Sequence, residues 1–326
     1  MPPSLKYSHN KHDEKSILNH AYKYYIGVLI AVILWGSNFV VIKIALQQVD
    51  TLALLSIRFV LSTMILGGIC LFRQPRMTTP LSVRNYIFLF FLGILGIAGF
   101  NLGLFYGLND TSPIHASLIV SLSPLMTLLI ASRFNIERVN LSHVIALLLC
   151  MIGVFLVIGS PLHDSQFMIK GDLIIFVGTL SWSVYTIFST KIKSQIEPLQ
   201  LTFILMFFGS ICIVLLSSFH LNLFSALTEI NTQAWGLILY MAIFTTCIPH
   251  LLWVHSVRKI GPTESSLFFN LIPVFATIFA MFTGFIPDQY QIIGIIISFT
   301  GLAIPNLYSY IMNRTHLVTK KEAVNK

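Results

Sequence analysis

The stretch PIHASLIVSLSPLMTLLIA at residues 113–131 recurs without a gap as PTESSLFFNLIPVFATIFA at residues 262–280. Each copy begins with a proline and carries a second one, Pro124 or Pro273, at the same place inside its apolar run. A proline within a long apolar run is unusual, so its recurrence in register indicates an internal duplication. We therefore predict two homologous halves.

The composition is that of an integral membrane protein. Of the 326 residues, 56% are hydrophobic and only 10% are charged, whereas a soluble domain keeps about 25% charged. Apolar runs of about twenty residues recur along the chain, the length that a helix needs to cross about 30 Å of hydrocarbon. The strands of a barrel would instead alternate in polarity, so the predicted fold class is an all-α polytopic membrane protein.

Ten transmembrane helices are predicted. Their ranges are 24–46, 51–73, 84–107, 113–133, 140–159, 171–192, 198–219, 233–257, 263–284 and 289–312. The first apolar run is too long for a signal-peptide core and no cleavage pattern follows it, so we expect an uncleaved span. The chain is thus divided into a cytoplasmic tail at 1–23, five-helix repeats at 24–159 and 171–312, and a second cytoplasmic tail at 313–326.

Lysine and arginine predict the orientation of the spans. With the N-terminus inside, the basic residues gather in the inner loops and tails, while the outer loops hold only Lys170, with Lys43 at the outer end of the first span. This bias predicts that both termini are cytoplasmic, and it explains the net charge of +8 without nucleic acid. Because five is odd, the second repeat must cross the membrane upside down, and such inverted repeats are typical of secondary transporters.

Positions outside the opening stretch also align between the halves. The aligned pairs are Trp35 with Trp182, Asp50 with Glu197, Asn101 with His250, and Tyr106 with His255. The third span also carries Gly99, Gly103 and Gly107 at four-residue spacing. This stripe predicts close packing against another helix, not a phosphate loop, because it lies within a span and no strand precedes it.

Three segments carry a resemblance to a known family. They are WGSNFVVIKIAL at 35–46, LLSIRFVLS with its Arg58 at 54–62, and NLGLFYGLNDTSPIHASLIVSLSPLMTLLIA at 101–131. Over about residues 24–312 the chain resembles the EamA family of the drug/metabolite transporter superfamily. The second half departs from the pattern, since no Gly-Ser-Asn follows Trp182 and Leu205 stands where Arg58 would pair.

The resemblance implies a ten-helix inner-membrane carrier of small metabolites, often amino acids, that frequently works as an exporter. It also implies that spans three, four, eight and nine surround a central cavity, with spans five and ten at the periphery.

Pro124 and Pro273 are the candidate hinge residues. Each removes a backbone donor and should free a carbonyl four residues earlier, near Val120 and Phe269. A freed carbonyl in the membrane must be satisfied by protein or by cavity water. The prolines therefore predict either a bend that opens a polar site at the midplane or a tolerated kink in a packed helix.

The candidate substrate-binding residues are polar or aromatic side chains at membrane depth. They are Trp35, Asn38, Arg58, Asn101, Tyr106, Ser117, Ser121, Tyr185, His250, Trp253, Ser266 and Asn270. Arg58 could bind a substrate carboxylate or serve as a structural clamp with helix-end carbonyls or Asp50. His250 could exchange a proton, donate to a substrate or be a satisfied core histidine. For the serines, asparagines and aromatic residues the alternatives are interhelical hydrogen bonds and boundary anchoring.

The residues that are absent narrow the function. No Asp or Glu lies in the middle of a span, which weakens a cationic-drug antiporter, and no GxSxG, HExxH or intramembrane aspartate pair indicates an enzyme. The four cysteines lie in apolar segments without CxxC spacing, so we expect no metal or cofactor. We predict a secondary-active transporter of a neutral, zwitterionic or anionic metabolite, amino-acid-like and exported by preference. A multidrug or cationic efflux carrier, and with less support a channel or a membrane-embedded enzyme, are the alternatives.

The predicted partners are a small-molecule metabolite and the lipid bilayer, and the predicted location is a bacterial inner (plasma) membrane. Proton and counter-solute coupling are both open, as are a monomer and a homodimer. The identity of the substrate, the direction of transport and the coupling ion do not follow from the sequence.

Overall fold

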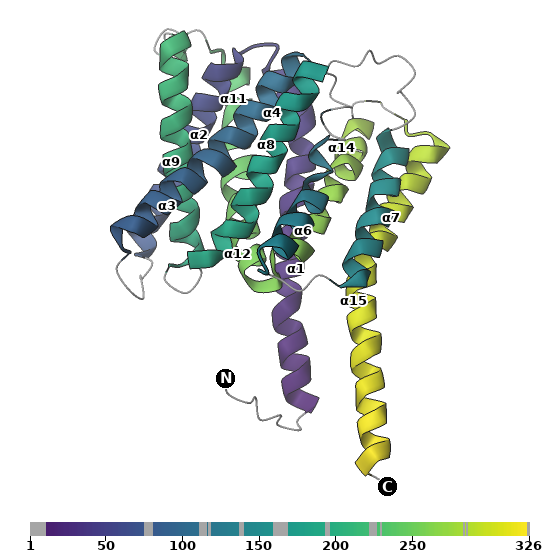
Figure 1. Cartoon of the computed structure of the whole chain (residues 1–326). Helices are drawn as coiled ribbons and strands as arrows, with labels where there is room; N and C mark the ends of the chain where they lie inside the picture. Colours follow the sequence, from purple (N-terminus) through teal and green to yellow (C-terminus); the bar gives the residue numbers. More distant parts are fainter. Residues whose placement is uncertain are drawn as a thin grey trace.

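The structure is a computed structural model. It describes residues 11–74, 81–110, 116, 119–136, 140–158, 169–192, 196–221, 227–228, 230–282, 284 and 286–324. Every regular element in these ranges is a helix. Figure 1 shows a bundle from one end of which α1 (Lys11–Ala45) and α15 (Gln289–Val324) extend together.

The remaining helices follow in chain order. They are α2 (Thr51–Arg73), α3 (Val83–Gly93), η1 (Ile94–Gly99), α4 (Phe100–Asn109), α6 (Ser123–Arg133), α7 (Leu141–Ile158), α8 (Ile169–Phe188), η3 (Ser189–Ile192), α9 (Pro198–His220), α11 (Thr232–Tyr240), η4 (Met241–Cys247), α12 (Ile248–Ile260), α13 (Pro262–Leu267), η5 (Phe268–Leu271) and α14 (Ile272–Met281).

Seven stretches of the described chain are long and apolar enough to cross a membrane. They are Tyr22–Ile42, Thr51–Arg73, Val83–Leu108, Ile169–Ile192, Pro198–His220, Thr232–Ile260 and Pro262–Met281. Two shorter apolar helices, Leu141–Leu156 and Gln289–Pro305, coincide with the predicted fifth and tenth spans. Residues 113–115 and 117–118 of the predicted fourth span lie outside the described residues, and α6 covers its second half. The all-helical membrane fold is therefore confirmed, while the number of ten spans stays a prediction.

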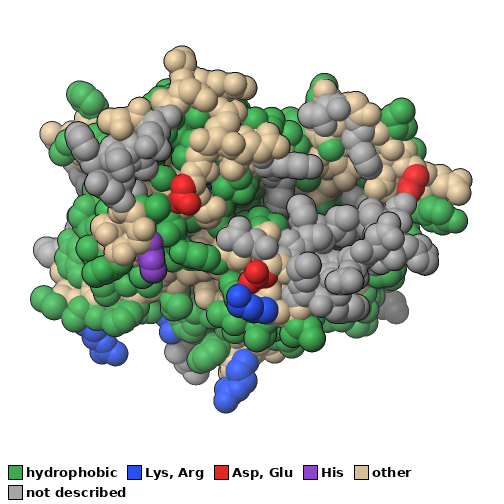
Figure 2. Space-filling view, turned by 90° about the horizontal axis from the view of Figure 1, so that it is seen from above, with side chains coloured by type: hydrophobic (Ala, Val, Ile, Leu, Met, Phe, Trp, Pro, Cys, Tyr) green, Lys and Arg blue, Asp and Glu red, His purple; other side chains and the backbone are tan. Residues whose placement is uncertain are grey.

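The outer surface of the bundle is suited to lipid. Large apolar side chains on the outermost helices are exposed, among them Leu148 and Phe155 of α7 and Ile296 of α15. Figure 2 views the bundle from the end opposite the α1 and α15 extensions and shows hydrophobic side chains around its perimeter. Such a contiguous apolar surface would be a liability in water but is matched to hydrocarbon.

Equivalent helices of the two halves make equivalent packing contacts. In the first half α1 packs on α12 and α14, and in the second α8 packs on α4 and α6. Likewise α2 contacts η4 while α9 contacts η1, and α2 and α9 also pack on each other. The α7–α15 pair lies at one edge of the bundle (Figure 1), as the family resemblance implies for spans five and ten.

The glycine stripe of the third span packs closely against α8, as predicted. A Cβ atom built on Gly103 would lie 2.9 Å from the Cα atom of Gly178, and one on Gly107 would lie 2.3 Å from Cγ1 of Ile175. Gly99 is less crowded, since its nearest neighbours stand at 3.4 Å or more. Glycine thus lets α4 and α8 approach until their backbones touch.

Candidate functional site

Spans three and eight are interrupted by π-helical segments at equivalent positions. In span three η1 joins α3 to α4, and in span eight η4 joins α11 to α12. The alignment that pairs Asn101 with His250 superimposes residues 94–99 on 243–248, so the two segments overlap in the repeat over residues 243–247. Segments of this kind are rare in helices and are frequent at functional sites. No pattern identified in the sequence indicated them.

The α-helices of spans four and nine are interrupted just before their prolines. Pro273 lies in the first turn of α14, directly after the 3-10 segment η5, and Pro124 lies in the first turn of α6 after a turn at residues 121–122. At such positions the missing N–H takes no hydrogen bond from the helix. Each proline thus lies in the first turn of an α-helical segment, and for Pro273 that segment belongs to a span that runs without a gap over Pro262–Met281. The alternatives of a bend and of a tolerated kink both stay predictions, as does the hinge role.

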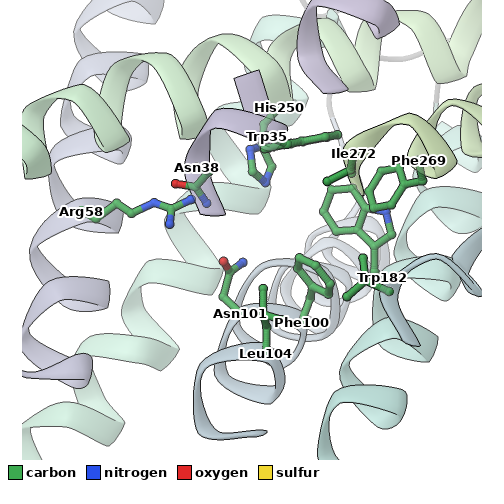
Figure 3. Close-up of a pocket in the computed structure, with 11 residues that line it drawn as sticks. Trp35, Asn38, Arg58, Phe100, Asn101, Leu104, Trp182, His250, Phe269 and Ile272 are labelled. Carbon is green, nitrogen blue, oxygen red and sulfur yellow. The ribbon is translucent and has the colours of Figure 1, made fainter. Parts of the chain in front are cut away.

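A cavity lies where these interrupted spans meet. It is lined by Trp35, Asn38, Arg58, Phe100, Asn101, Leu104, Val120, Trp182, His250, Phe269 and Ile272 (Figure 3). Its volume of about 40 Å³ has room for a few water molecules, whereas sites for small molecules measure about 300–1,000 Å³. Admitting a metabolite would therefore require the surrounding helices to separate.

Arg58 forms the charged end of the cavity. The side chain is only 2% exposed, its guanidinium lies 5.2 Å from the ring centroid of Phe59, and Nε donates a hydrogen bond of 2.6 Å to Oγ1 of Thr246 in η4. Its Nη1 has no hydrogen-bond partner among the described residues. A buried arginine costs about 3 kcal/mol on insertion scales, so this donor needs an acceptor, which cavity water or a ligand would supply.

The expected clamp between Arg58 and Asp50 does not form. Oδ1 of Asp50 instead accepts hydrogen bonds from the backbone N–H groups of Leu52 and Ala53, at 2.8 and 3.2 Å, and so caps α2. No ion pair joins Arg58 to an acidic residue in the part of the chain that the structure describes. The acid at position 50 therefore serves the start of the helix and leaves the arginine charge uncompensated.

His250 lies beside Arg58, and both side chains are hydrogen-bonded to Thr246. Nδ1 of His250 stands 2.8 Å from the carbonyl oxygen of Thr246, and because a carbonyl only accepts, Nδ1 carries the hydrogen. Its Nε2 is buried and has no partner within the described ranges. Only one of the two ring nitrogens is therefore hydrogen-bonded, whereas a fully satisfied core histidine would have partners for both.

Aromatic rings form the side of the cavity opposite Arg58 and Asn38 (Figure 3), and His250 lies between the two sides, 5.5 Å from Trp35 and 5.8 Å from Trp182 between ring centroids. The aligned residues Trp35 and Trp182 meet edge to face with 5.6 Å between ring centroids, and Phe269 lies 5.3 Å from Trp35 and 5.5 Å from Trp182. Tyr185 and Trp253 stand behind this wall, 5.0 and 5.8 Å from Trp182. The site is therefore divided into a polar side and an aromatic side.

The two halves of the chain, residues 22–159 and 169–307, each match the sequence model of the EamA-like transporter family. The chain belongs to this family. Membership confirms the resemblance and, with the names of the relatives, indicates a membrane transporter and not an enzyme.

Relatives of this EamA protein carry the same general description. Over 281 residues it is 32% identical to the uncharacterized transporter YyaM of Bacillus subtilis (strain 168), covering 85% of this chain and 92% of that protein. Over 252 residues it is 27% identical to an uncharacterized transporter of Archaeoglobus fulgidus, covering 77% and 87%. A solved structure titled "Crystal structure of protein" shares the fold with a TM-score of 0.72 at 18% identity, over 89% of this chain and 98% of that one.

Five of the predicted site residues line the cavity. They are Trp35, Asn38, Arg58, Asn101 and His250. Tyr185 and Trp253 support its aromatic wall, and Tyr106 lies away from the lining on α4 with 40% of its surface exposed. The remaining candidates are Ser121, Ser266 and Asn270, which are buried without lining the cavity, and Ser117, which is outside the described residues. Which of these residues bind substrate stays a prediction.

Six lining residues of this family member were not predicted. They are Phe100, Leu104, Val120, Trp182, Phe269 and Ile272. Trp182 could have been found, since it aligns with Trp35. The other five are apolar, and apolar side chains fill every span, so no sequence signal separates them from residues that pack or face lipid.

Proposed function

We propose that this EamA protein is a secondary-active transporter that moves a small metabolite across a bacterial inner membrane by alternating access, preferably outward. The metabolite is neutral, zwitterionic or anionic, and an amino-acid-like solute is favoured. The cavity carries the proposal, because it combines an uncompensated arginine with a lining that has no acidic residue in the part of the chain that the structure describes. A cationic drug would meet the Arg58 charge without a counter-charge, so multidrug efflux has less support.

Two contacts between equivalent residues support an inverted repeat with ten spans. Trp35 meets its aligned partner Trp182, and Oγ1 of Thr63 lies 2.7 Å from Oγ of Ser210, which occupies the same place in the alignment. Only residues beside a pseudo-twofold axis can touch their own equivalents. An axis in the membrane plane, as in other inverted-repeat carriers, would run through both pairs and past the cavity.

Contacts at the proposed inner end would close that side of the cavity. The hydroxyl of Tyr25 donates to the carboxylate of Glu264, and Nε2 of His143 lies 3.9 Å from the other carboxylate oxygen. Glu264 lies in the first turn of α13, which packs against α6. This cluster joins three spans, so rocking one repeat against the other would have to break it.

Counterflow in proteoliposomes tests the proposed function. We expect the purified protein to accumulate a labelled solute against a large internal pool of the same unlabelled solute, with a rate that saturates, because a carrier must return through its bound state. The solutes to screen are the twenty protein amino acids and common organic acids, with protein-free liposomes as the control. Flux that rises linearly without counterflow would indicate a channel, and no flux of any solute would refute the carrier.

The orientation predicts a difference in labelling between two exposed positions. Gln74, just after α2, should face the cytoplasm, whereas His220, at the end of α9, should face outward. In a variant lacking the four native cysteines, we expect Cys introduced by His220→Cys to react with a membrane-impermeant maleimide in intact cells. Cys introduced by Gln74→Cys should react only after permeabilisation. The reverse result would exclude cytoplasmic termini.

A further inference from the structure

The cavity holds two adjacent polar groups with opposite hydrogen-bonding needs. Thr246 of η4 anchors both of them, through its hydroxyl to Nε of Arg58 at 2.6 Å and through its carbonyl to Nδ1 of His250 at 2.8 Å. Arg58 is left with a charged donor, Nη1, and His250 with Nε2, both buried and without partners among the described residues. With Nδ1 protonated, Nε2 of the neutral ring is an acceptor.

Asn38 and Asn101 also differ in whether their free end is a hydrogen-bond donor or an acceptor. Oδ1 of Asn38 accepts a hydrogen bond of 2.8 Å from Oγ1 of Thr245. The Nδ2 group of Asn38, which donates, points away from Thr245. Nδ2 of Asn101 donates to the carbonyl of Ile97 at 2.8 Å, which leaves its Oδ1 as the free end of the amide. The cavity therefore offers donors from Arg58 and Asn38 and acceptors from His250 and Asn101.

The aromatic side of the cavity favours an apolar side chain on the ligand. Trp35, Trp182, Phe100 and Phe269 offer rings, and Leu104 an aliphatic chain, with no charged group among them. A charged side chain placed there would lose its hydration without gaining a partner, and such burial is costly. An apolar side chain would instead exchange water for ring contacts.

We propose that the cavity selects hydrophobic carboxylates whose α-substituent donates a hydrogen bond, that is, apolar α-amino or α-hydroxy acids. The carboxylate pairs with Arg58 and Asn38, and the side chain lies against the two tryptophans. An α-ammonium donates to both His250 and Asn101, whereas an α-hydroxyl donates its single hydrogen to His250. His250 is thereby a specificity-determining residue, since its acceptor rejects carboxylates without a donor. This inference rests on the proposed transport function, because it names the solute of the same cavity.

Binding of four probes to the purified full-length protein tests the selection. We expect L-phenylalanine and L-3-phenyllactate to bind in thermal-shift titrations, because each has both the carboxylate and the donor. 3-Phenylpropionate, which lacks the donor, should bind about 10- to 100-fold more weakly, since it leaves buried acceptors unpaired. L-Glutamate, whose side chain is charged, should not bind measurably. The two expected binders reveal whether an ammonium, a hydroxyl or either one satisfies the acceptors.

A histidine variant with a matched control adds a second arm. His250→Phe keeps a ring against Trp35 but removes the Nε2 acceptor, so the preference for 3-phenyllactate over 3-phenylpropionate should fall well below that of the unsubstituted protein, with Asn101 as the acceptor that remains. His255→Phe on the same helix is the control, because His255 stacks on Tyr24 at 5.2 Å and does not line the cavity. Should His250→Phe fail to fold, the probe series on the unsubstituted protein still decides.

The outcomes separate this inference from the proposed function. Equal binding of 3-phenylpropionate and the donor-bearing acids, preference for glutamate, or no binding by any probe overturns the inference, as does an unchanged preference in His250→Phe. If another solute then shows saturable counterflow, transport stands without this selectivity. If the probes bind in the expected order but nothing undergoes counterflow, the binding site stands and the carrier does not.

Discussion

Replacing Arg58 with methionine is expected to abolish transport of a carboxylate solute while leaving the protein about as stable as before. The substitution removes a charge-assisted contact to the solute in a desolvated site, worth about 2–5 kcal/mol, or about 30- to 5,000-fold in affinity. The folded protein loses the Nε bond to Thr246, about 1.5–3 kcal/mol, but is relieved of burying an arginine, about 3 kcal/mol. These two contributions to stability nearly cancel.

Counterflow and the melting temperature in detergent, measured on the same preparation, distinguish a ligand from a clamp. Leu205→Met is the matched control, because Leu205 occupies the aligned position in the second repeat and is fully buried. It should leave transport intact, since exchanges of similar volume cost less than about 1.5 kcal/mol. A large fall in the melting temperature of Arg58→Met with normal transport by the folded fraction would make Arg58 a structural clamp.

The Gly107→Ala substitution is expected to destabilise the protein by about 1–3 kcal/mol, the usual cost of overpacking. The added methyl group would stand 2.3 Å from Cγ1 of the buried Ile175 and 2.8 Å from the backbone oxygen of Gly171. Because the second obstacle is backbone, α4 and α8 would have to move apart. The melting temperature of the purified protein and the yield of monodisperse protein measure the effect.

Gly99→Ala tests whether the effect comes from this contact or from the loss of any glycine in the stripe. Its Cβ would meet Ile94 and Ser181 only at 3.4–3.6 Å, an ordinary contact, and alanine favours a helix over glycine by about 1 kcal/mol. We expect an unchanged or slightly higher melting temperature. Equal losses in both variants would show that the close approach of α4 and α8 is not the cause.

The cavity residues show where prediction from the sequence reached its limit. Arg58, Asn38, Asn101 and His250 were predicted because polar groups are costly at membrane depth. Tyr106 satisfied a similar criterion but lies on the exposed side of α4, because hydropathy locates a span in the sequence without giving its rotation about the helix axis. In a membrane, lipid and protein interior are similarly apolar, so the apolar pattern distinguishes the lipid-facing side only weakly.

By itself the sequence determined the membrane class, the approximate positions of the apolar spans and the internal duplication, because these follow from runs of apolar residues and from recurring prolines. Only the tertiary structure decided that a turn precedes Pro124 and a 3-10 segment precedes Pro273, that π segments interrupt spans three and eight, and that Thr246 holds Arg58 and His250 together. Those features depend on contacts between residues up to nearly two hundred positions apart. The repeated proline stretch therefore indicated where two halves meet, and the packing of the halves decided which side chains face the space between them.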